Sequence, residues 1–263
     1  MNETSSVIAI VADRLEAAQK ARQAISPVRE SLGATNIDAA YEVQKELARR
    51  RIDRGALVTG RKIGLTSRAV QRQLGVDQPD FGILFGDMER LDGGTISIGH
   101  LIEPRIEAEV AFVLGSDLDG ELNIDVIRSS VNFAVAALEI VDSRVVGWDI
   151  AISDTVADNG SSALYVLGSQ RLKLMQFVPR DVTMSMRIDG AVVSQGIGTA
   201  CLGDPLLALF WLACAAQEFG EPLRAGQVVL SGALGPMIPV TPGQQVSAEI
   251  MPLGTVSIEF SKE

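Results

Sequence analysis

The feature that most constrains the fold is a series of short β-type segments that begins near residue 95. The segments either alternate apolar and polar residues or are continuously apolar, and few helical stretches separate them. A doubly wound parallel sheet needs a helix between consecutive strands, so this order argues against that fold. The sequence predicts a mixed β domain from TISIGH, RIEAEVAFVL, FAVAALEIVDS, VTMSMRID, AVVSQG, QVVLSG, VSAEIM and TVSIEF.

The beginning of the chain has a different pattern. Apolar residues recur at helical spacing over residues 7–24 and again over residues 36–53. Thr35 with Asp38 resembles a capping box at the start of the second helix, and Gly55 suits its C-terminal end. We therefore expect an α+β fold with a small helical N-terminal part, residues 1–55, packed on a larger mixed β domain, residues 56–263.

Several shorter elements are also predicted. ALVTGRKIGL is typical of a strand that runs into a turn, and Thr66–Leu74 of a short helix, whereas VDQPDFGILFGDM reads as a loop with a brief apolar run. Asp189-Gly190 between two alternating runs predicts a hairpin turn. Asp204-Pro205 predicts the N-cap and first residue of a helix that continues through Glu218.

Composition excludes several classes of protein. A net charge of −10 makes nucleic acid an unfavourable partner. No apolar run reaches the roughly 18–20 residues that span a bilayer, and the N-terminus lacks the features of a signal peptide, so we expect no membrane association. Cys201 and Cys214 lie in apolar surroundings and are expected to be buried free thiols, which fits a cytoplasmic location.

A single histidine, His100, restricts the catalytic chemistry. Any Ser-His-Asp or Cys-His arrangement would have to use it, and it lies at a predicted junction between a strand and a loop. The sequence therefore favours catalysis by carboxylates, a lysine and a metal.

Two glutamates in RIEAEVAFVL occupy the same face of a predicted strand. Side chains alternate along a strand, so Glu107 and Glu109 point one way while the apolar residues between them point toward a core. Such a pair is often just a solvated surface, and otherwise it is stabilised by cations or by a shared metal. The face continues with Ala111 and Val113, so it is not uniformly polar, which favours the metal.

A third glutamate, Glu139 in AVAALEIVDSR, is embedded in apolar residues. An isolated buried carboxylate is costly unless a cation or partner accompanies it. Three carboxylates from two strands, with other positions left for water and substrate, suit Mg²⁺ or Mn²⁺. Zinc is less apt because neither motif contains histidine or cysteine.

Three other polar features have both a structural and a functional interpretation. Lys62 in GRKIGLT is either a solvent-facing lysine or a group near the metal that orients an anionic substrate or moves a proton. Asp80, expected in the following loop, has the same two interpretations. The turn-rich cluster Asp158–Ser161 in DTVADNGSS can present backbone N–H groups to an anion.

These motifs coincide, in order, with those of a known family. GRKIGLT, QLGVDQPDFGILFGDM, PRIEAEVAFVL, ALEIVDSR, DTVADNGSS and LSGALGPM resemble the 2-hydroxypenta-2,4-dienoate (2-keto-4-pentenoate) hydratases of the fumarylacetoacetate hydrolase superfamily. The resemblance covers nearly the whole chain. It implies that superfamily's mixed β-roll and a hydro-lyase that converts 2-hydroxypenta-2,4-dienoate (2-oxopent-4-enoate) to 4-hydroxy-2-oxopentanoate during meta-cleavage degradation of aromatic compounds.

The resemblance also implies roles for individual residues and partners. It implies that Glu107, Glu109 and Glu139 hold Mg²⁺ or Mn²⁺ and that Lys62 and Asp80 handle protons and orient the substrate. Ser161 and Asn159 would bind the substrate, with Ser161 near its carboxylate. The substrate would be a small 2-oxo acid. The chain would form a homo-oligomer, a pentamer or a decamer, and a partner enzyme of the same pathway could associate with it.

One departure and three alternatives remain. Relatives often have the sequence C-L-G-H-P where this chain has Asp204 in place of the histidine. Aspartate is a better helix N-cap than histidine, and the change leaves substrate preference open.

The first alternative is a 4-oxalocrotonate (2-oxo-3-hexenedioate) decarboxylase, although SGALGPM favours a hydratase. The second is an acylpyruvate hydrolase, which commonly needs a histidine that the first 99 residues lack. The third is a non-catalytic subunit that stabilises a hydratase–decarboxylase complex.

Overall fold

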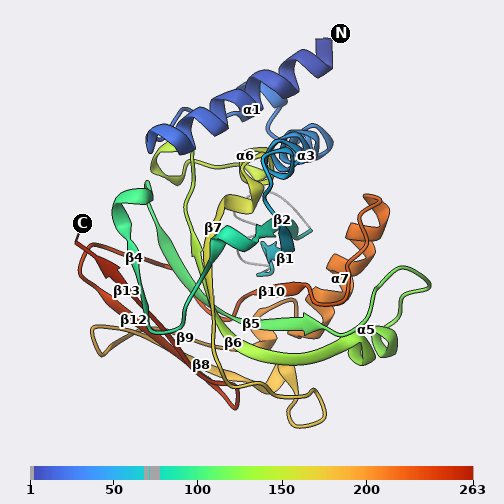
Figure 1. The fold of residues 1–263 in the computed structure, drawn as a ribbon, viewed down its shortest axis with the longest axis vertical. Helices are drawn as coiled ribbons and strands as arrows, with labels where there is room; N and C mark the ends of the chain where they lie inside the picture. The colour runs from blue at the N-terminus through green and yellow to red at the C-terminus, as the bar shows by residue number, and fades with distance from the viewer. Residues whose placement is uncertain (1–2, 68–70, 72–77, 263) are drawn as a thin grey trace.

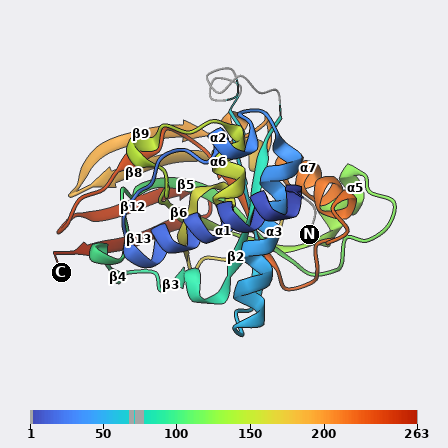
Figure 2. The same cartoon turned by 90° about the horizontal axis from the view of Figure 1, so that it is seen from above.

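The computed structural model of the chain describes residues 3–67, 71 and 78–262. In this part of the chain, two mixed β-sheets pack together, and helices cover one end of them (Figure 1). Seen from above, α1 and α3 cross over the strands, with the smaller sheet on one side and α5 and α7 on the other (Figure 2). The predicted α+β class is confirmed.

The larger sheet has eight strands. Its order is β2 (Asp80–Phe85), β1 (Val58–Gly64), β10 (Val228–Ala233), β5 (Arg105–Leu114), β6 (Val131–Val141), β7 (Ser162–Leu167) and β3 (Glu89–Arg90), with β11 (Ile238–Pro239) also paired with β5. The pairs β1–β10 and β3–β7 are parallel and the others are antiparallel, so the sheet is mixed.

The smaller sheet has five strands, in the order β4 (Gly94–Ser97), β13 (Gly254–Ser261), β12 (Gln245–Met251), β8 (Thr183–Ile188) and β9 (Ala191–Ile197). The predicted hairpin turn between β8 and β9 is confirmed, because Asp189 and Gly190 have φ values of 49° and 83°, the left-handed region that such a turn requires. Only the β13–β4 pair is parallel among the strands described here.

The helices are α1 (Glu3–Ala21), α2 (Arg29–Leu32), α3 (Ile37–Asp53), α5 (Ile124–Ser130), α6 (Ile152–Ala157) and α7 (Pro205–Glu218). Short 3₁₀ turns are η1 (Gly86–Met88), η2 (Ile98–His100), η3 (Val146–Trp148), η4 (Asn159–Ser161), η5 (Pro179–Asp181) and η6 (Gly198–Ala200). Asp204 caps α7 as predicted, since its Oδ1 accepts a hydrogen bond from Leu206 N at 2.8 Å.

The two predicted N-terminal helices are confirmed as α1 and α3, but the capping box was wrong. Asn36, not Thr35, is the N-cap of α3, because Asn36 directly precedes the first helical residue and its Oδ1 accepts from Ala39 N at 3.2 Å. Gly55 ends the helix as predicted, with a φ of 92°. A boundary near residue 55 stays a prediction.

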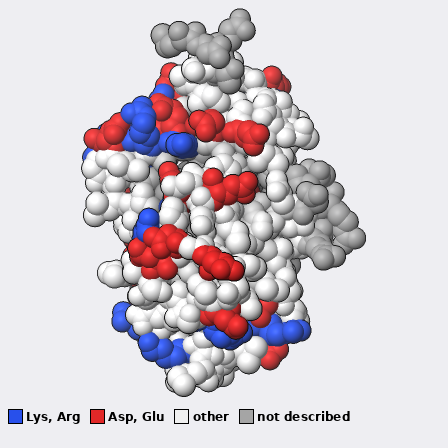
Figure 3. Space-filling model, turned by 90° about the vertical axis from the view of Figure 1, so that its right-hand side faces the viewer, with Lys and Arg blue, Asp and Glu red and all other residues white. Residues whose placement is uncertain are grey.

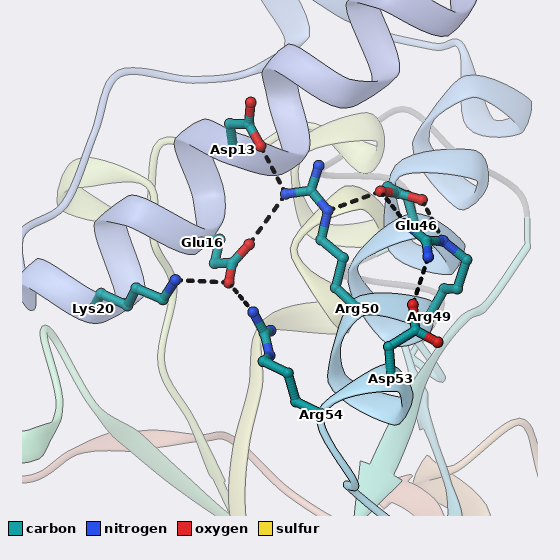
Figure 4. A network of polar contacts seen from close by, with 8 residues as sticks. All are labelled: Asp13, Glu16, Lys20, Glu46, Arg49, Arg50, Asp53 and Arg54. Atoms are coloured by element: carbon teal, nitrogen blue, oxygen red, sulfur yellow. Dashed lines mark hydrogen bonds and ion pairs between the residues drawn. The ribbon is translucent and has the colours of Figure 1, made fainter.

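A network of ion pairs fixes α1 against α3 on the surface (Figure 4). Arg50 Nη1 lies 2.7 Å from Asp13 Oδ1 and 3.1 Å from Glu16 Oε2, and its Nε lies 2.8 Å from Glu46 Oε1. Arg54 Nη1 also contacts Glu16, at 2.5 Å. Exposed pairs contribute little singly, but a shared network holds two helices in one relative orientation.

The main core lies between the two sheets. The residues of β5 that alternate with its glutamates, Ile106, Ala108, Val110, Phe112 and Leu114, are all buried in it, as predicted. One face of α7 packs into the same core. By length and composition alone, Gly198–Glu218 is long and apolar enough to cross a membrane, a test that the core helix of a soluble protein also passes.

Three local predictions need comment. The segment expected to be a loop contains a strand instead: β2 is buried along its whole length, and a fully buried strand lacks the alternation that marks a half-exposed one. The predicted helix Thr66–Leu74 falls largely outside the described residues.

The prediction that both cysteines are buried is wrong for one of them. Cys201 is buried, but Cys214 is exposed. Most of the surface of α7 is apolar, but only one face of the helix meets the core, and Cys214 lies outside that face. Both thiols are free.

Candidate metal centre

The three predicted glutamates meet on one face of the larger sheet. Glu107 lies directly opposite Glu139 in the β5–β6 pair, and Glu109 lies two residues further along β5. Residues paired across a sheet share a face, so all three carboxylates project together, away from the main core. Glu107 is half-buried, whereas Glu109 and Glu139 are completely buried.

The carboxylates are close enough to share one cation. One oxygen from each glutamate lies within 4.8 Å of the others. In the part of the chain that the structure describes, Glu109 Oε1 and Glu139 Oε1 are buried without a hydrogen-bond partner. Unpartnered buried carboxylate oxygens are costly, and a divalent cation that prefers oxygen ligands would satisfy them. The residues present therefore fit a divalent metal.

A break in β10 orients Glu109. Leu230 pairs with Ala111 but Ala233 pairs with Glu109, so β10 bulges at Ser231 and Gly232. The bulge directs Gly232 N–H to Glu109 Oε2, at 2.5 Å. Gly232 has a φ of 103°, and a Cβ there would lie 2.4 Å from the Thr66 side chain, so only glycine fits. This role of Gly232 was not predicted from the sequence, because a bulge leaves no periodic signal.

Lys62 supplies positive charge to the same face. It pairs with Leu230 of β10, which pairs with Ala111 of β5, so its side chain projects on the glutamate side. It is buried, and its Nζ lies 3.2 Å from Glu139 Oε2. Burial lowers the pKa of Lys62, but the surrounding carboxylates, Glu139 foremost, outweigh burial and raise it. The ammonium group is therefore protonated at neutral pH.

Burial changes the pKa of the acidic groups in the direction opposite to its effect on Lys62. Burial, with the nearby charge of Glu139, raises the pKa of Glu107 to about 7, although Lys62 opposes the change. Burial and the same neighbour raise the pKa of Glu109 well above its usual range. These carboxyl groups hold protons in the absence of a cation, because their charges repel one another in a poorly solvated site.

This repulsion predicts that metal affinity depends on pH. Below pH 7 a proton on Glu107 competes with the cation, so the apparent Mn²⁺ affinity should fall by about tenfold per pH unit for one released proton. Because the pKa of Glu107 in the fold exceeds the ordinary 4.5, the metal-free protein should also lose stability as pH rises from 4.5 to 7. Calorimetric titrations at pH 6, 7 and 8 test the first effect. An affinity that is constant across these values would contradict it.

Asp80 begins β2 and lies on the Lys62 side of the sheet. Gly64 pairs with Asp80 and Lys62 pairs with Gly82, so Asp80 and Lys62 share a face. A Cβ on Gly64 would lie 2.1 Å from Asp80 Oδ1, so the glycine makes room for this carboxyl group. Both Asp80 oxygens are buried without a hydrogen-bond partner among the described residues, and burial raises the pKa of Asp80 although Lys62 opposes it.

The predicted polar turn lies over Lys62 and β2. Asn159, Gly160 and Ser161 have φ values of 57°, 61° and 53°, a left-handed turn. A Cβ on Gly160 would lie 2.8 Å from Lys62 Cε, and one on Gly82 would lie 2.3 Å from Asn159 O. Close packing therefore brings this turn, Lys62 and the start of β2 together.

The two polar side chains of this turn have different surroundings. Asn159 Oδ1 accepts from Ile83 N at 2.7 Å, and Asn159 Nδ2 donates to Ile83 O at 2.9 Å. Ser161 Oγ makes longer contacts of 3.5 Å with Asp158 Oδ2 and Thr155 Oγ1. Asn159 is therefore held by β2, whereas the side-chain contacts of Ser161 with other described residues are weak.

A buried ion pair that the sequence analysis missed holds the turn to the end of β6. Arg144 Nε lies 2.5 Å from Asp158 Oδ1, and Arg144 Nη2 donates to Asp158 O at 2.7 Å. Burial raises the pKa of Asp158 to about 6 although Arg144 opposes it, so Asp158 is ionised at neutral pH. Both residues lie in motifs noted above, but nothing local to either motif indicates that they pair.

His100, the single histidine, is exposed at the end of η2, between β4 and β5. Figure 3 shows acidic and basic side chains interspersed along one face of the molecule, with most basic groups next to acidic ones. This distribution agrees with the acidic net charge and does not suggest a nucleic-acid surface on that face.

Comparison with known proteins agrees with this geometry. Residues 63–260 match the family described as Fumarylacetoacetate (FAA) hydrolase C-terminal. The chain belongs to the fumarylacetoacetate hydrolase family. The fold type expected from the sequence is thereby confirmed.

Relatives within this family include hydratases. The chain is 50% identical over 252 residues to the TodF product hydratase of Pseudomonas putida. The aligned region covers 95% of this chain and 94% of that protein. The chain is 48% identical over 254 residues to a 2-keto-4-pentenoate hydratase of Paraburkholderia xenovorans, with 94% of each chain covered. These matches confirm the resemblance to the hydratases.

A solved structure of a different enzyme has nearly the same fold. The 4-oxalocrotonate decarboxylase of Pseudomonas putida, complexed with magnesium and adipate, superposes with a TM-score of 0.93 at 32% identity, over 99% of this chain and 98% of that one. That structure contains magnesium, and the carboxylate cluster described above suits a divalent metal, so the two observations agree in supporting use of a divalent metal.

Proposed function

We propose that this chain is a metal-dependent hydro-lyase that converts 2-hydroxypenta-2,4-dienoate to 4-hydroxy-2-oxopentanoate in the meta-cleavage degradation of aromatic compounds. The observation that carries the proposal is the buried arrangement of three glutamates and Lys62 on one sheet face. The high identity to 2-keto-4-pentenoate hydratases over almost the whole chain selects hydration among the reactions of the family.

Glu107, Glu109 and Glu139 would hold Mg²⁺ or Mn²⁺, because the cluster offers only carboxylate oxygens. When bound, the cation would supply Lewis acidity at the substrate's C2 oxygen and carboxylate. Glu107 is the least buried of the three, so substrate would approach from its side. Gly232 N–H keeps one Glu109 oxygen occupied and so fixes the orientation of that carboxylate.

Lys62 and Asp80 would have different roles in the reaction. Ketonisation of the dienol removes the C2 hydroxyl proton and adds a proton at C5, and hydration then adds hydroxide at C4 and a proton at C3. The carboxylates keep Lys62 protonated, so it suits holding the anionic substrate as a fixed positive charge. The pKa of Asp80 is raised, which favours the protonated form of its carboxyl group, so Asp80 suits exchange of protons with substrate and water.

Ser161 and Asn159 would act at the substrate carboxylate in different ways. The contacts of the Ser161 hydroxyl with the described residues are long, so it can turn toward an anion. The side chain of Asn159 is bonded to Ile83, so this residue would contribute by holding the turn in place beside Lys62.

Assembly and location belong to the same proposal. The chain would form a homo-oligomer, a pentamer or a decamer, in the cytoplasm, and could associate with a partner enzyme of the same pathway. Light scattering during size-exclusion chromatography gives the subunit number. A monomer at micromolar concentration would contradict this part of the proposal.

The second candidate is decarboxylation of 4-oxalocrotonate, because a decarboxylase of that substrate shares the fold over the whole chain. The purified chain should be given each substrate in turn, with release of CO₂ and formation of 4-hydroxy-2-oxopentanoate measured. Hydration without CO₂ release supports the hydratase. CO₂ release from the dicarboxylate without hydration of the dienoate assigns the chain to the decarboxylases. A chain inactive on both would fit the stabilising subunit.

A further inference from the structure

The outer edge of β2 is completed by side chains instead of a neighbouring strand. β2 is the edge strand of the larger sheet and pairs with β1 on one side. On its other side, Ile83 N and O are both bonded by the Asn159 side chain. Phe81 N and O are bonded by two side chains of α3, Tyr41 and Gln44. Unpaired backbone groups at a sheet edge need such partners when they are buried.

Gln44 connects two segments that carry predicted site residues. Its side chain is buried, and its Nε2 donates to Phe81 O and to Val156 O, both at 2.9 Å. Phe81 directly follows Asp80. Val156 lies in α6, which leads into the turn that contains Ser161. One amide group therefore fixes the distance between the start of β2 and the approach to this turn.

Tyr41 holds the same residue from one turn earlier in α3. Its hydroxyl oxygen accepts from Phe81 N at 3.3 Å, and its ring stacks on the Phe81 ring with centroids 4.7 Å apart. Tyr41 and Gln44 are three positions apart, so they project from the same face of the helix. The N–H, the carbonyl and the ring of Phe81 are thus all held by α3.

Asp80 depends on this support because its own side chain accepts no hydrogen bond from the described residues. Neither of its carboxylate oxygens has a hydrogen-bond partner in the described part of the chain. Successive strand residues point to opposite faces, so fixing the peptide groups of Phe81 fixes the direction in which Asp80 projects toward Lys62. A misplacement of about 1 Å at a reacting group can cost about 10²-fold in rate.

We propose that Gln44 and Tyr41 are positioning residues that hold Asp80 in its catalytic orientation. This inference rests on the proposed acid–base role of Asp80. Both residues precede the segment 63–260 that matches the family, so the N-terminal helices contribute directly to the site of the shared domain. The ion pairs of Figure 4 would in turn fix α3 against α1.

The test is a double-mutant cycle between α3 and Asp80. Gln44→Met keeps the length of the side chain and removes both donors, and Tyr41→Phe removes only the hydroxyl, so at least one variant should fold. Each should lower kcat, Gln44→Met by about tenfold, while Mn²⁺ affinity stays within about twofold because β5 and β6 are untouched. In an Asp80→Asn background, neither substitution should lower kcat further. Val43→Ala, a core substitution in the same helix, is the control and should act independently of Asp80.

A second measurement does not depend on the substrate. In protein labelled with ¹³C at aspartate carboxyl groups, the Asp80 signal is assigned by its loss in Asp80→Asn. Gln44→Met should shift this signal and Val43→Ala should not. An unshifted signal, or an equal kcat loss in both backgrounds, would overturn the positioning role. Failure of the wild-type chain to hydrate the dienoate would overturn the proposed function, and the carboxyl signal would still decide the inference.

Discussion

Replacing Glu107 with glutamine should abolish metal-dependent turnover and leave the fold intact. The substitution preserves shape but removes one of three charges that would hold the cation, so kcat/KM should fall by at least about 10³-fold, consistent with several kcal/mol of lost charge stabilisation. Steady-state kinetics at saturating Mg²⁺ measure the loss. Glu259→Gln is the matched control, because Glu259 is an exposed strand glutamate of β13.

Thermal unfolding of the same variant separates loss of metal from loss of structure. Without metal, the midpoint of Glu107→Gln should equal or exceed that of the wild type, because one repelling buried carboxyl group is gone. Wild-type protein should gain stability from metal, about 2.7 kcal/mol at 100 times the Kd, and the variant should gain almost none. Full metal-dependent activity in Glu107→Gln would remove Glu107 from the metal site.

Replacing Lys62 with methionine should lower kcat by about 10²–10³-fold without weakening metal binding, because its fixed charge would no longer stabilise negative charge that develops on the substrate. The buried ammonium lies 3.2 Å from Glu139 and would repel a bound cation, so its loss should leave Mn²⁺ affinity unchanged or tighter. Isothermal titration with Mn²⁺ and steady-state kinetics measure the two effects separately. Lys45→Met, at an exposed position of α3, is the control.

The opposite result for Lys62 has a clear meaning. If Lys62→Met loses metal affinity and activity in the same proportion, the lysine serves mainly to organise the carboxylates. If kcat is unchanged while KM rises, Lys62 only binds the substrate, and if both are unchanged, Lys62 has no part in the reaction.

The parts of this molecule that follow from local pattern were predictable. Alternation along RIEAEVAFVL placed Glu107 and Glu109 on one face and the apolar residues in the core, and the structure confirms both. Asp189-Gly190 and Asp204 were assigned correctly because turns and caps depend on a few adjacent residues. Glu139 joined the cluster because a lone carboxyl group in an apolar strand needs a partner.

Features that depend on contacts between distant segments could not be predicted. β2 has no alternation because both of its faces are buried, so Asp80 was expected in a loop. The Arg144–Asp158 pair and the contacts of Gln44 with Phe81 and Val156 join elements whose meeting only the folded chain determines. The bulge at Gly232 likewise depends on the pairing of β10 with β5.

The central claim is that the carboxylate cluster and its metal hydrate a small dienol acid. The most direct test is to mix purified protein with fresh 2-hydroxypenta-2,4-dienoate, with Mg²⁺ or with excess chelator, and to follow dienol absorbance and product. The account predicts rapid formation of 4-hydroxy-2-oxopentanoate with Mg²⁺ and almost none with chelator. Equal turnover in the two samples, or no hydration in either, would contradict it.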